Sequence, residues 1–204
     1  MTPEALVEEL AQRVAGLPAR ARVLVDGAPA TQPGHLADAL VDPLRAVGRP
    51  VVRVHADDFL RPASVRFERG RHDADAYLEE RWDVGALARE VLDPFAEDGR
   101  YLPTLWDAAR DRATRAAYAQ APDGAVLVLA GSLLLGRRLD AELTVHLTVR
   151  AATLARRTPA EERWTLPAFA RYDDETVPAQ VADVVVHVDD PRHPALEVRT
   201  RATA

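Results

Sequence analysis

The chain alternates short apolar runs with segments in which apolar residues recur at helical spacing. Residues 3–16 have such a spacing and predict a first helix, and the β-branched run at 22–26 predicts a buried strand. A second helical pattern starts at Leu36, and Pro43 is expected to kink or divide that helix because proline has no backbone N–H. Residues 50–54 predict a second strand.

The rest of the chain continues this alternation after one irregular stretch. Residues 60–81 show no period and are expected to form a long irregular connection, after which helical spacing returns at 83–92. A helix is predicted from Ala151, and apolar runs predict further strands at 125–131, 143–149 and 182–188, the last of which is expected to be the final strand.

This order of elements indicates an α/β fold. Short apolar strands that alternate with helices are typical of a parallel sheet covered on both faces. In such sheets ligands lie at the carboxyl ends of the strands, so the loops after Asp26, His55 and Leu129 should converge on one site. No repeat or Gly/Ser linker divides the 204 residues, and we expect a single domain with an N-terminal helix within 1–20.

Composition narrows the classes of function. The formal net charge is −6, which argues against nonspecific nucleic-acid binding because that needs a basic surface. There is no cysteine for disulfides, thiolate chemistry or a Cys-based zinc site. The acidic, amphipathic start is unlike a signal peptide, and the longest apolar run, 125–136, is too short to cross a bilayer. We therefore expect a cytoplasmic protein that binds neither nucleic acid nor membrane.

The segment VLVDGAPATQPGHLADAL (23–40) has the frame of a phosphate-binding loop with other residues at its decisive positions. The template G-x-x-x-x-G-K-[ST] lies between a strand and a helix, as this segment does. Gln32, Pro33 and Gly34 stand where the template has its second glycine, its lysine and its Ser/Thr. The phosphate-loop equivalents are Gly27, Thr31, Gln32, Pro33, Gly34 and His35.

Each of these replacements removes a function of the loop. Pro33 supplies neither an N–H nor an ammonium group, Gln32 carries a Cβ where glycine permits positive φ, and Gly34 has no hydroxyl for Mg²⁺. No lysine replaces the lost one, because all 26 cationic residues are arginine, a bias that a GC-rich coding sequence explains. Two interpretations stay open: a turn without a ligand, or weak anion binding at a helix that starts on proline.

Further segments, in chain order, resemble the uridine kinase family of P-loop phosphotransferases. After the loop they are VVRVHADDFLRP, DADAYLEERWD, LPTLWDAARD, VLVLAGSLLL, LTVHLTVRAATLARRTPAEERW and ADVVVHVDDP, so the likeness covers most of the chain. DDF is the most informative match, because the family carries D-[DS]-F-[YH] there. The resemblance implies a three-layer P-loop NTPase-like domain of the nucleoside kinase type, with a mostly parallel sheet, an acceptor-side loop at 60–81 and a small helical lid at 150–180.

The resemblance also implies an acceptor pocket. The first acid of the family signature receives the proton of the attacking hydroxyl, which places this role on Asp57; the alternative is that Asp57 or Asp58 caps a turn. Phe59 is expected to pack in the core. The implied pocket residues are Asp57, Asp58, Phe59, Arg61, Tyr77, Trp106 and Asp107.

Trp106 and its surroundings leave the acceptor undefined. A tryptophan at this place either stacks on a base or sugar or completes a core beside Leu102 and Leu105. The family has a histidine a few residues later, where this chain has Asp111. This departure leaves open whether the acceptor is a nucleoside.

Arginines form two further groups with two interpretations each. The segment RAATLARRTPAEERW resembles the family's lid, in which Arg156 and Arg157, with Arg163 behind them, would close over a phosphate; the alternative is a solvated helix face with i,i+4 ion pairs. The arginines of 60–81 either meet an anionic ligand or pair with nearby acids, and they are Arg61, Arg66, Arg69 and Arg71.

The strand at 125–129 is followed by Ala130-Gly131, where the family has an acid and a glycine. The carboxylate that helps to hold magnesium is thus absent, and Ser132 is a poor substitute because Mg²⁺ prefers carboxylates and phosphates. The sequence predicts no metal site.

Three functions are consistent with these residues. The first is a pseudokinase without an assigned cofactor, which keeps a pocket for a nucleoside-like or phosphorylated small molecule. The second is an enzyme: a divergent kinase that uses Mg·ATP with arginine in place of lysine, or a former acceptor pocket that performs another reaction. The third is a structural protein that forms a homodimer.

Overall fold

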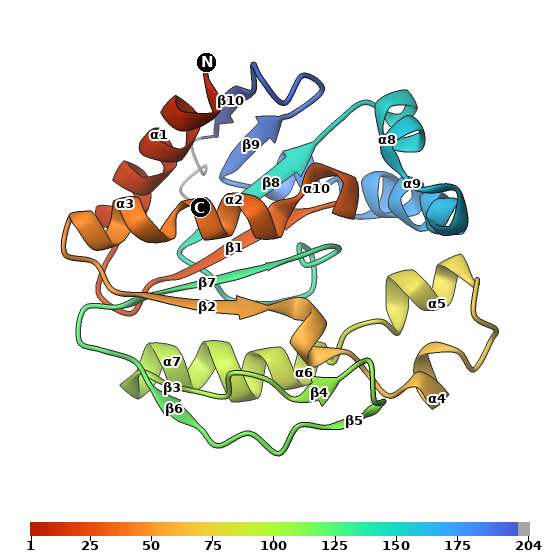
Figure 1. The fold of residues 1–204 in the computed structure, drawn as a ribbon, viewed down its shortest axis with the longest axis horizontal. Helices are drawn as coiled ribbons and strands as arrows, with labels where there is room; N and C mark the ends of the chain where they lie inside the picture. Colours follow the sequence, from red (N-terminus) through yellow and green to blue (C-terminus); the bar gives the residue numbers. More distant parts are fainter. Residues whose placement is uncertain (200–204) are drawn as a thin grey trace.

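The computed structural model describes residues 1–199, which contain a six-stranded sheet of order β10-β9-β8-β1-β7-β2 (Figure 1). Five of these strands are parallel, and β10 pairs antiparallel with β9. The mostly parallel α/β sheet predicted from the sequence is therefore confirmed. Its strands are β1 Arg22–Gly27, β2 Val51–His55, β7 Val126–Gly131, β8 Leu143–Thr148, β9 Val184–His187 and β10 Ala195–Val198.

Helices cover both faces of the sheet and give the molecule three layers (Figure 1). Successive residues of β1 point to opposite faces: Val23 and Val25 join one core and Leu24 joins the other. Because both faces are buried, the central strands β1, β7 and β8 are buried along almost their whole length rather than at alternate positions. One face carries α1 Pro3–Ala15, α2 Pro33–Ala39 and α3 Val41–Ala46, and the other carries α6 Val84–Ala86, a π-helical turn Leu87–Leu92 and α7 Asp93–Asp98.

The helical pattern that begins near Leu36 is divided, as expected from Pro43. α2 ends at Ala39, Leu40 forms the junction, and α3 follows. A proline ring clashes with the carbonyl four residues earlier, which places the break near Ala39. α2 starts on Pro33, a residue favoured in the first helical turn.

The stretch 60–81 is not the irregular connection that its sequence suggested. It contains the short helices α4 Ala63–Arg66 and α5 Ala74–Glu79. Asp73 caps α5 by accepting a hydrogen bond from the Ala76 N–H at 2.7 Å. One or two turns are too short to show a helical period, and the cap was the available signal.

Short strands were also missed. Two small antiparallel pairs lie outside the main sheet: β3 Arg100–Tyr101 with β6 Ala119–Gln120, and β4 Trp106–Asp107 with β5 Arg112–Ala113. The expectation that the run at 182–188 is the final strand was wrong, because β10 adds an antiparallel edge beyond it. An exposed edge strand carries little apolar signal.

Residues 150–180 form the helical segment that covers the carboxyl edge of the sheet (Figure 1). It consists of α8 Ala151–Arg157, a 3-10 turn Ala160–Thr165, α9 Leu166–Glu175 and α10 Pro178–Val181. α9 packs against α5, so this segment and the stretch 60–81 meet above the sheet edge.

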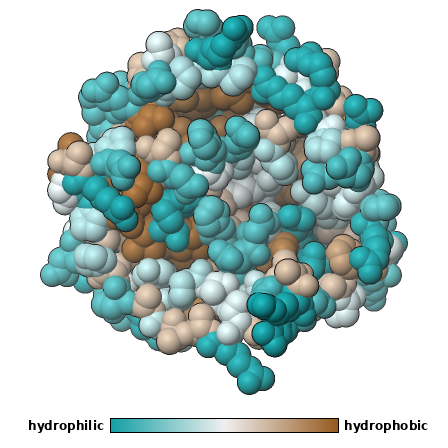
Figure 2. Space-filling model, in the orientation of Figure 1, coloured by the Kyte–Doolittle hydropathy of each residue, from teal (hydrophilic) through white to brown (hydrophobic). Residues whose placement is uncertain are grey.

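The face of the molecule seen in Figure 2 is mostly hydrophilic, and its hydrophobic surface lies mainly in hollows in the left and upper parts of the view. Within residues 1–199, no helix has the length and apolar character needed to cross a membrane.

Candidate functional site

The loop after β1 is closed by its own hydrogen bonds. Residues Pro29–Thr31 form a 3-10 turn in which the Thr31 N–H donates to the Ala28 carbonyl at 2.8 Å and the Gln32 N–H donates to the Pro29 carbonyl at 3.0 Å. Pro33 has no N–H to offer. Three consecutive positions of the loop therefore present no backbone donor to a ligand.

The side chain of Thr31 fills the inside of this loop. Its hydroxyl donates to the Ala28 carbonyl at 2.7 Å, and it is buried. A Cβ added to Gly27 would lie 2.5 Å from the Thr31 hydroxyl oxygen and 2.9 Å from the Leu147 carbonyl oxygen. Gly27 is thus required by the close packing of the loop against β8 and Thr31.

Gln32 keeps the backbone conformation for which the template uses glycine. Its φ is 58° and its ψ is 54°, in the left-handed region. It is the residue before α2, and its side chain accepts no capping hydrogen bond from the helix. The Gln32 and His35 side chains are exposed, whereas Pro33 is buried. Gln32 thus adopts the left-handed conformation at the position where the template has its second glycine.

Beneath the loop, a buried hydrogen-bond network centres on Asp26, the residue before Gly27. The Asp26 carboxyl is fully buried and accepts hydrogen bonds from the Leu134 N–H at 2.9 Å and the Tyr172 hydroxyl at 3.1 Å, and it lies 2.8 Å from His146 Nδ1. Tyr172 belongs to α9 and also accepts from the Leu135 N–H at 2.9 Å. Burial, followed by the charge of Asp26, raises the pKa of the Tyr172 phenol.

This network ties α9 of the helical segment to the end of β1, directly before the loop. The cavity left between Ala28, Thr31, the end of β8 and α9 has a volume of about 20 Å³. One water molecule needs roughly 10–15 Å³ of such space. The space between the loop, β8 and α9 is therefore filled almost entirely by protein.

The end of β7 offers no metal ligand. Ala130 is buried, and a Cβ on Gly131 would lie 2.5 Å from the Ala56 Cβ, so the two residues mark a close approach to the turn after β2. The register pairs Asp26 with Gly131 and His55 with Ala130, which confirms that the three strand ends converge. Across residues 1–199, no cluster of three or more His, Cys, Asp or Glu side chains could hold a metal ion.

Two of the predicted acceptor residues are joined through an arginine. Arg81 Nη2 donates to Asp57 Oδ1 at 3.0 Å, and the Arg81 guanidinium lies 4.7 Å from the centre of the Tyr77 ring. Burial raises the pKa of Tyr77, and burial also raises the pKa of Asp58. Phe59 is fully buried in the core, as expected for a packing residue.

The other predicted acceptor residues point elsewhere. Arg61 forms an ion pair with Glu80 and lies outside the cavity that Tyr77 lines. Asp107 accepts from the Ala109 and Arg110 N–H groups at 3.1 Å each and from the Arg110 side chain at 3.0 Å, and these bonds lower its pKa. Its role here is to cap the β4–β5 turn.

Trp106 is half-buried against the core and has a polar partner. Its indole N–H donates to Asp111 Oδ1 at 3.1 Å. The same oxygen accepts from the Ala63 N–H at 2.9 Å, and Arg66 Nη2 lies 3.9 Å from it. Asp111, at the position where the family has histidine, therefore ties the β4–β5 hairpin to α4.

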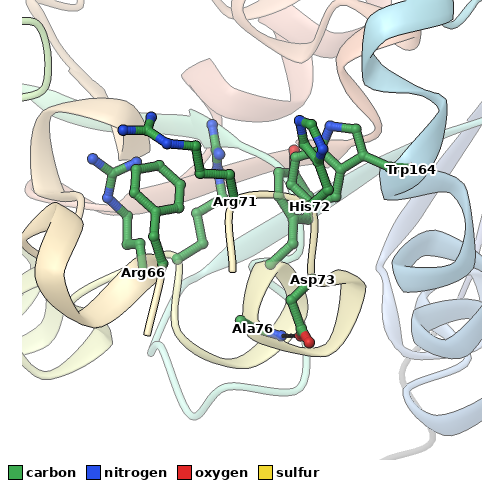
Figure 3. A pocket seen from close by; sticks show the side chains of 9 residues that line it. Arg66, Arg71, His72, Asp73, Ala76 and Trp164 are labelled. Atoms are coloured by element: carbon green, nitrogen blue, oxygen red, sulfur yellow. Dashed lines mark hydrogen bonds between the residues drawn. The ribbon is translucent and has the colours of Figure 1, made fainter. Parts of the chain in front are cut away.

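The cavity beside Asp57 has a volume of about 260 Å³ and lies between α4, α5 and the 3-10 turn of the lid (Figure 3). Phe67 lies beneath the guanidiniums of Arg66 and Arg71, at 4.7 and 5.2 Å from its ring centre. The complete lining is Arg66, Phe67, Arg71, His72, Asp73, Ala76, Tyr77, Arg81 and Trp164.

The predicted lid arginines are not gathered over the loop. Arg157 donates to the Val188 carbonyl at 2.9 Å and the Asp189 carbonyl at 2.8 Å, so it fixes the segment after β9. Arg156 and Arg163 are exposed. Neither the clamp nor the i,i+4 pairing describes Arg157, whose partners lie far along the chain.

Comparison with solved structures shows the same arrangement in several kinases. A possible uridine kinase of Bacillus stearothermophilus is 20% identical, with a TM-score of 0.73 over 88% of this chain and 96% of the other. A candidate fructose transport system kinase of Silicibacter sp. TM1040 is 26% identical, with a TM-score of 0.59 over 88% and 89%. D-glycerate 3-kinase of Cryptococcus neoformans is 15% identical, with a TM-score of 0.56 over 96% and 97%.

The chain has a uridine-kinase-like P-loop fold. No protein-family model matches it, and no curated protein does. In this fold the loop at 28–32 joins β1 to α2, and the DDF segment follows β2.

Sequence reasoning identified only part of this cavity. In the cavity beside Asp57, the sequence predicts Tyr77 as a pocket residue and offers Arg66 and Arg71 for an anionic ligand. It does not predict Arg81 or Trp164. Arg81 was hidden among charged residues, and Trp164 comes from the lid, which only the fold brings to α5. An aromatic residue in an otherwise polar, exposed segment was the signal for Trp164.

Proposed function

We propose that this protein is a pseudokinase: a kinase-like protein that does not use the phosphates of ATP and retains a pocket for a small polar or phosphorylated molecule. The observation that carries the proposal is the self-bonded loop at 28–33. A working loop directs successive N–H groups at the phosphates, with a lysine on the β and γ groups. Here two of those N–H groups bond to the loop's own carbonyls and a third is missing.

The size of the lost interactions supports this proposal. One preorganised donor to developing charge contributes roughly 3–4 kcal/mol, or a factor of about 10²–10³ in rate. The loop lacks several backbone donors. The lysine and the metal ligands of the template are missing as well. Such contributions do not simply add, but their joint loss leaves little phosphoryl transfer by the usual route.

Arginines that could replace the lysine have other partners. Arg22 Nη2 forms an ion pair with Glu142 Oε1 at 2.8 Å. Arg53 donates to Asp38 at 2.9 Å and to the Val128 carbonyl at 2.7 Å. Arg157 is bonded to two carbonyls after β9. A divergent kinase that uses arginine is for this reason the weaker candidate.

The acceptor side supports a retained pocket. Asp57 and Tyr77 meet at Arg81, and a cavity of about 260 Å³ opens beside them. The structural neighbours are a possible uridine kinase, a candidate fructose transport system kinase and a D-glycerate 3-kinase. All of these names refer to small hydroxylated compounds, and we propose a small polar ligand for this chain as well.

Calorimetric titration with a nonhydrolysable ATP analogue, with and without Mg²⁺, tests the proposal directly. We expect no binding at millimolar analogue and no ADP release with uridine or cytidine. Phosphorylation of either nucleoside at ordinary kinase rates would refute the pseudokinase assignment.

A grafted loop provides the matched positive control. The variant Gln32→Gly, Pro33→Lys, Gly34→Thr and Ala130→Glu restores the template letters on the same scaffold. Gain of analogue binding in this variant, together with its absence in the parent, would show that the residues of the loop and not the fold prevent binding.

A further inference from the structure

The cavity beside Asp57 concentrates positive charge in a chain whose net charge is −6. Its lining carries three arginines, Arg66, Arg71 and Arg81, against one carboxylate, Asp73. Asp73 is already occupied as the cap of α5, where it accepts from a backbone N–H at 2.7 Å. A concave surface with this excess of cations favours a negatively charged ligand.

Nearby acids neutralise these arginines only in part. Arg81 pairs with Asp57 at 3.0 Å, and Arg66 lies 3.9 Å from Asp111. Among residues 1–199, Arg71 makes no ion pair, and the buried Nε of Arg81 has no hydrogen-bond partner. Burial and the neighbouring charge of Arg81 lower the pKa of Arg66, so an anion between them would relieve an unfavourable contact.

Aromatic rings form the opposite wall. The Trp164 ring lies 5.4 Å from the Tyr77 ring at an angle of 87° and 5.2 Å from the His72 ring at 43°. Figure 3 shows Trp164 and His72 on one side of the cavity and Arg66 and Arg71 on the other. A flat ring can pack against the aromatic side while an acidic group attached to it reaches the guanidiniums.

We infer that this cavity binds a planar anion, a single aromatic ring or base that carries one phosphate or carboxylate group. The inference rests on the proposed function, which keeps this pocket as the ligand site. The cavity volume of about 260 Å³ limits the ligand to a small molecule. It lies just below the roughly 300–1,000 Å³ usual for drug-sized ligands.

Titration calorimetry of the full chain, without ATP or magnesium, tests the inference with five probes. Uridine 5′-monophosphate combines ring and phosphate, and orotate combines ring and carboxylate. Uridine has the ring alone, ribose 5-phosphate has the phosphate without the ring, and inorganic phosphate has neither ring nor sugar. We expect one of the first two to bind at least about tenfold more tightly than each of the last three, because one charge-assisted contact contributes about that factor.

Two arginine variants localise the site. Arg71→Gln removes an exposed cation of the lining, and we expect it to weaken binding of the preferred anion by about tenfold or more without changing the melting temperature. Arg69→Gln is the matched control, because Arg69 lies outside the lining and 3.7 Å from Glu79. It should leave the affinity unchanged.

The outcomes separate this inference from the proposed function. The planar-anion inference would be overturned if neither uridine 5′-monophosphate nor orotate bound more tightly than uridine, if no probe bound, or if the two variants had equal effects. Each of these results would leave the ATP result standing. Nucleoside phosphorylation by the parent protein would overturn the pseudokinase proposal, whatever the cavity binds.

Discussion

The Tyr172 hydroxyl joins α9 to the end of β1 and to the segment after β7, and Tyr172→Phe removes this one oxygen while keeping the ring. The hydroxyl donates to Asp26 at 3.1 Å and accepts from the Leu135 N–H at 2.9 Å, in a site where the tyrosine is 3% exposed. A hydrogen bond to a charged group contributes about 1.5–3 kcal/mol, and a buried donor left without a partner costs about 1–3 kcal/mol. Their summed range is about 2.5–6 kcal/mol, and because both contributions come from one hydroxyl and do not add fully, we expect a loss of about 3–4 kcal/mol in the free energy of unfolding.

Urea unfolding followed by circular dichroism measures this loss, and a thermal melt should show the midpoint falling by about 6–16 °C. Tyr118→Phe is the control, because its hydroxyl also donates to a carboxylate, Glu90, but the residue is 46% exposed. A loss below about 1 kcal/mol, or one no larger than in Tyr118→Phe, would refute the view that Tyr172 fixes α9 to the end of β1.

Three further predictions follow from the same region. The raised pKa of Tyr172 means that folding retains its proton, so stability is complete below about pH 10 and is lost above it. Between about pH 10 and 11.5 the free energy of unfolding, measured by urea titration, should fall by up to about 1.4 kcal/mol per pH unit more steeply in the parent than in Tyr172→Phe. Gly27→Ala should cost about 1–3 kcal/mol in a urea melt, since the Leu147 carbonyl cannot move aside. Arg157→Gln should accelerate hydrogen exchange after β9, whereas Arg156→Gln should not.

The sheet could be predicted from the sequence because its strands are buried on both faces. The run that became β7 is apolar throughout, and those that became β1 and β8 are mostly apolar and almost entirely buried, so strands of this kind are recognised without a partner. β10 could not be recognised, because its residues are mostly exposed at the antiparallel edge. The short helices of 60–81 depend on contacts with α9 and on an aspartate cap, and not on a period.

The candidate site was predictable only where its residues follow strands. Convergence of the loops after Asp26 and His55 required no more than a parallel sheet. The partners of Arg157 and of Asp111 could not be inferred, because hydrogen bonds to distant carbonyls and backbone amides leave no pattern in the sequence. Trp164 meets Tyr77 only after the lid has folded over α5.

The loop at 28–33 has a consequence for how the protein behaves in a cell whose nucleotide levels change. A phosphate-binding loop with unpaired amides gains order when a nucleotide arrives, and its lid follows. In this chain the amides of Thr31 and Gln32 are already paired, Pro33 has none, and Tyr172 hydrogen-bonds α9 to Asp26. The conformation of the loop and of α9 should therefore not change with the ATP concentration. A ligand in the cavity beside Asp57 would then bind independently of nucleotide levels.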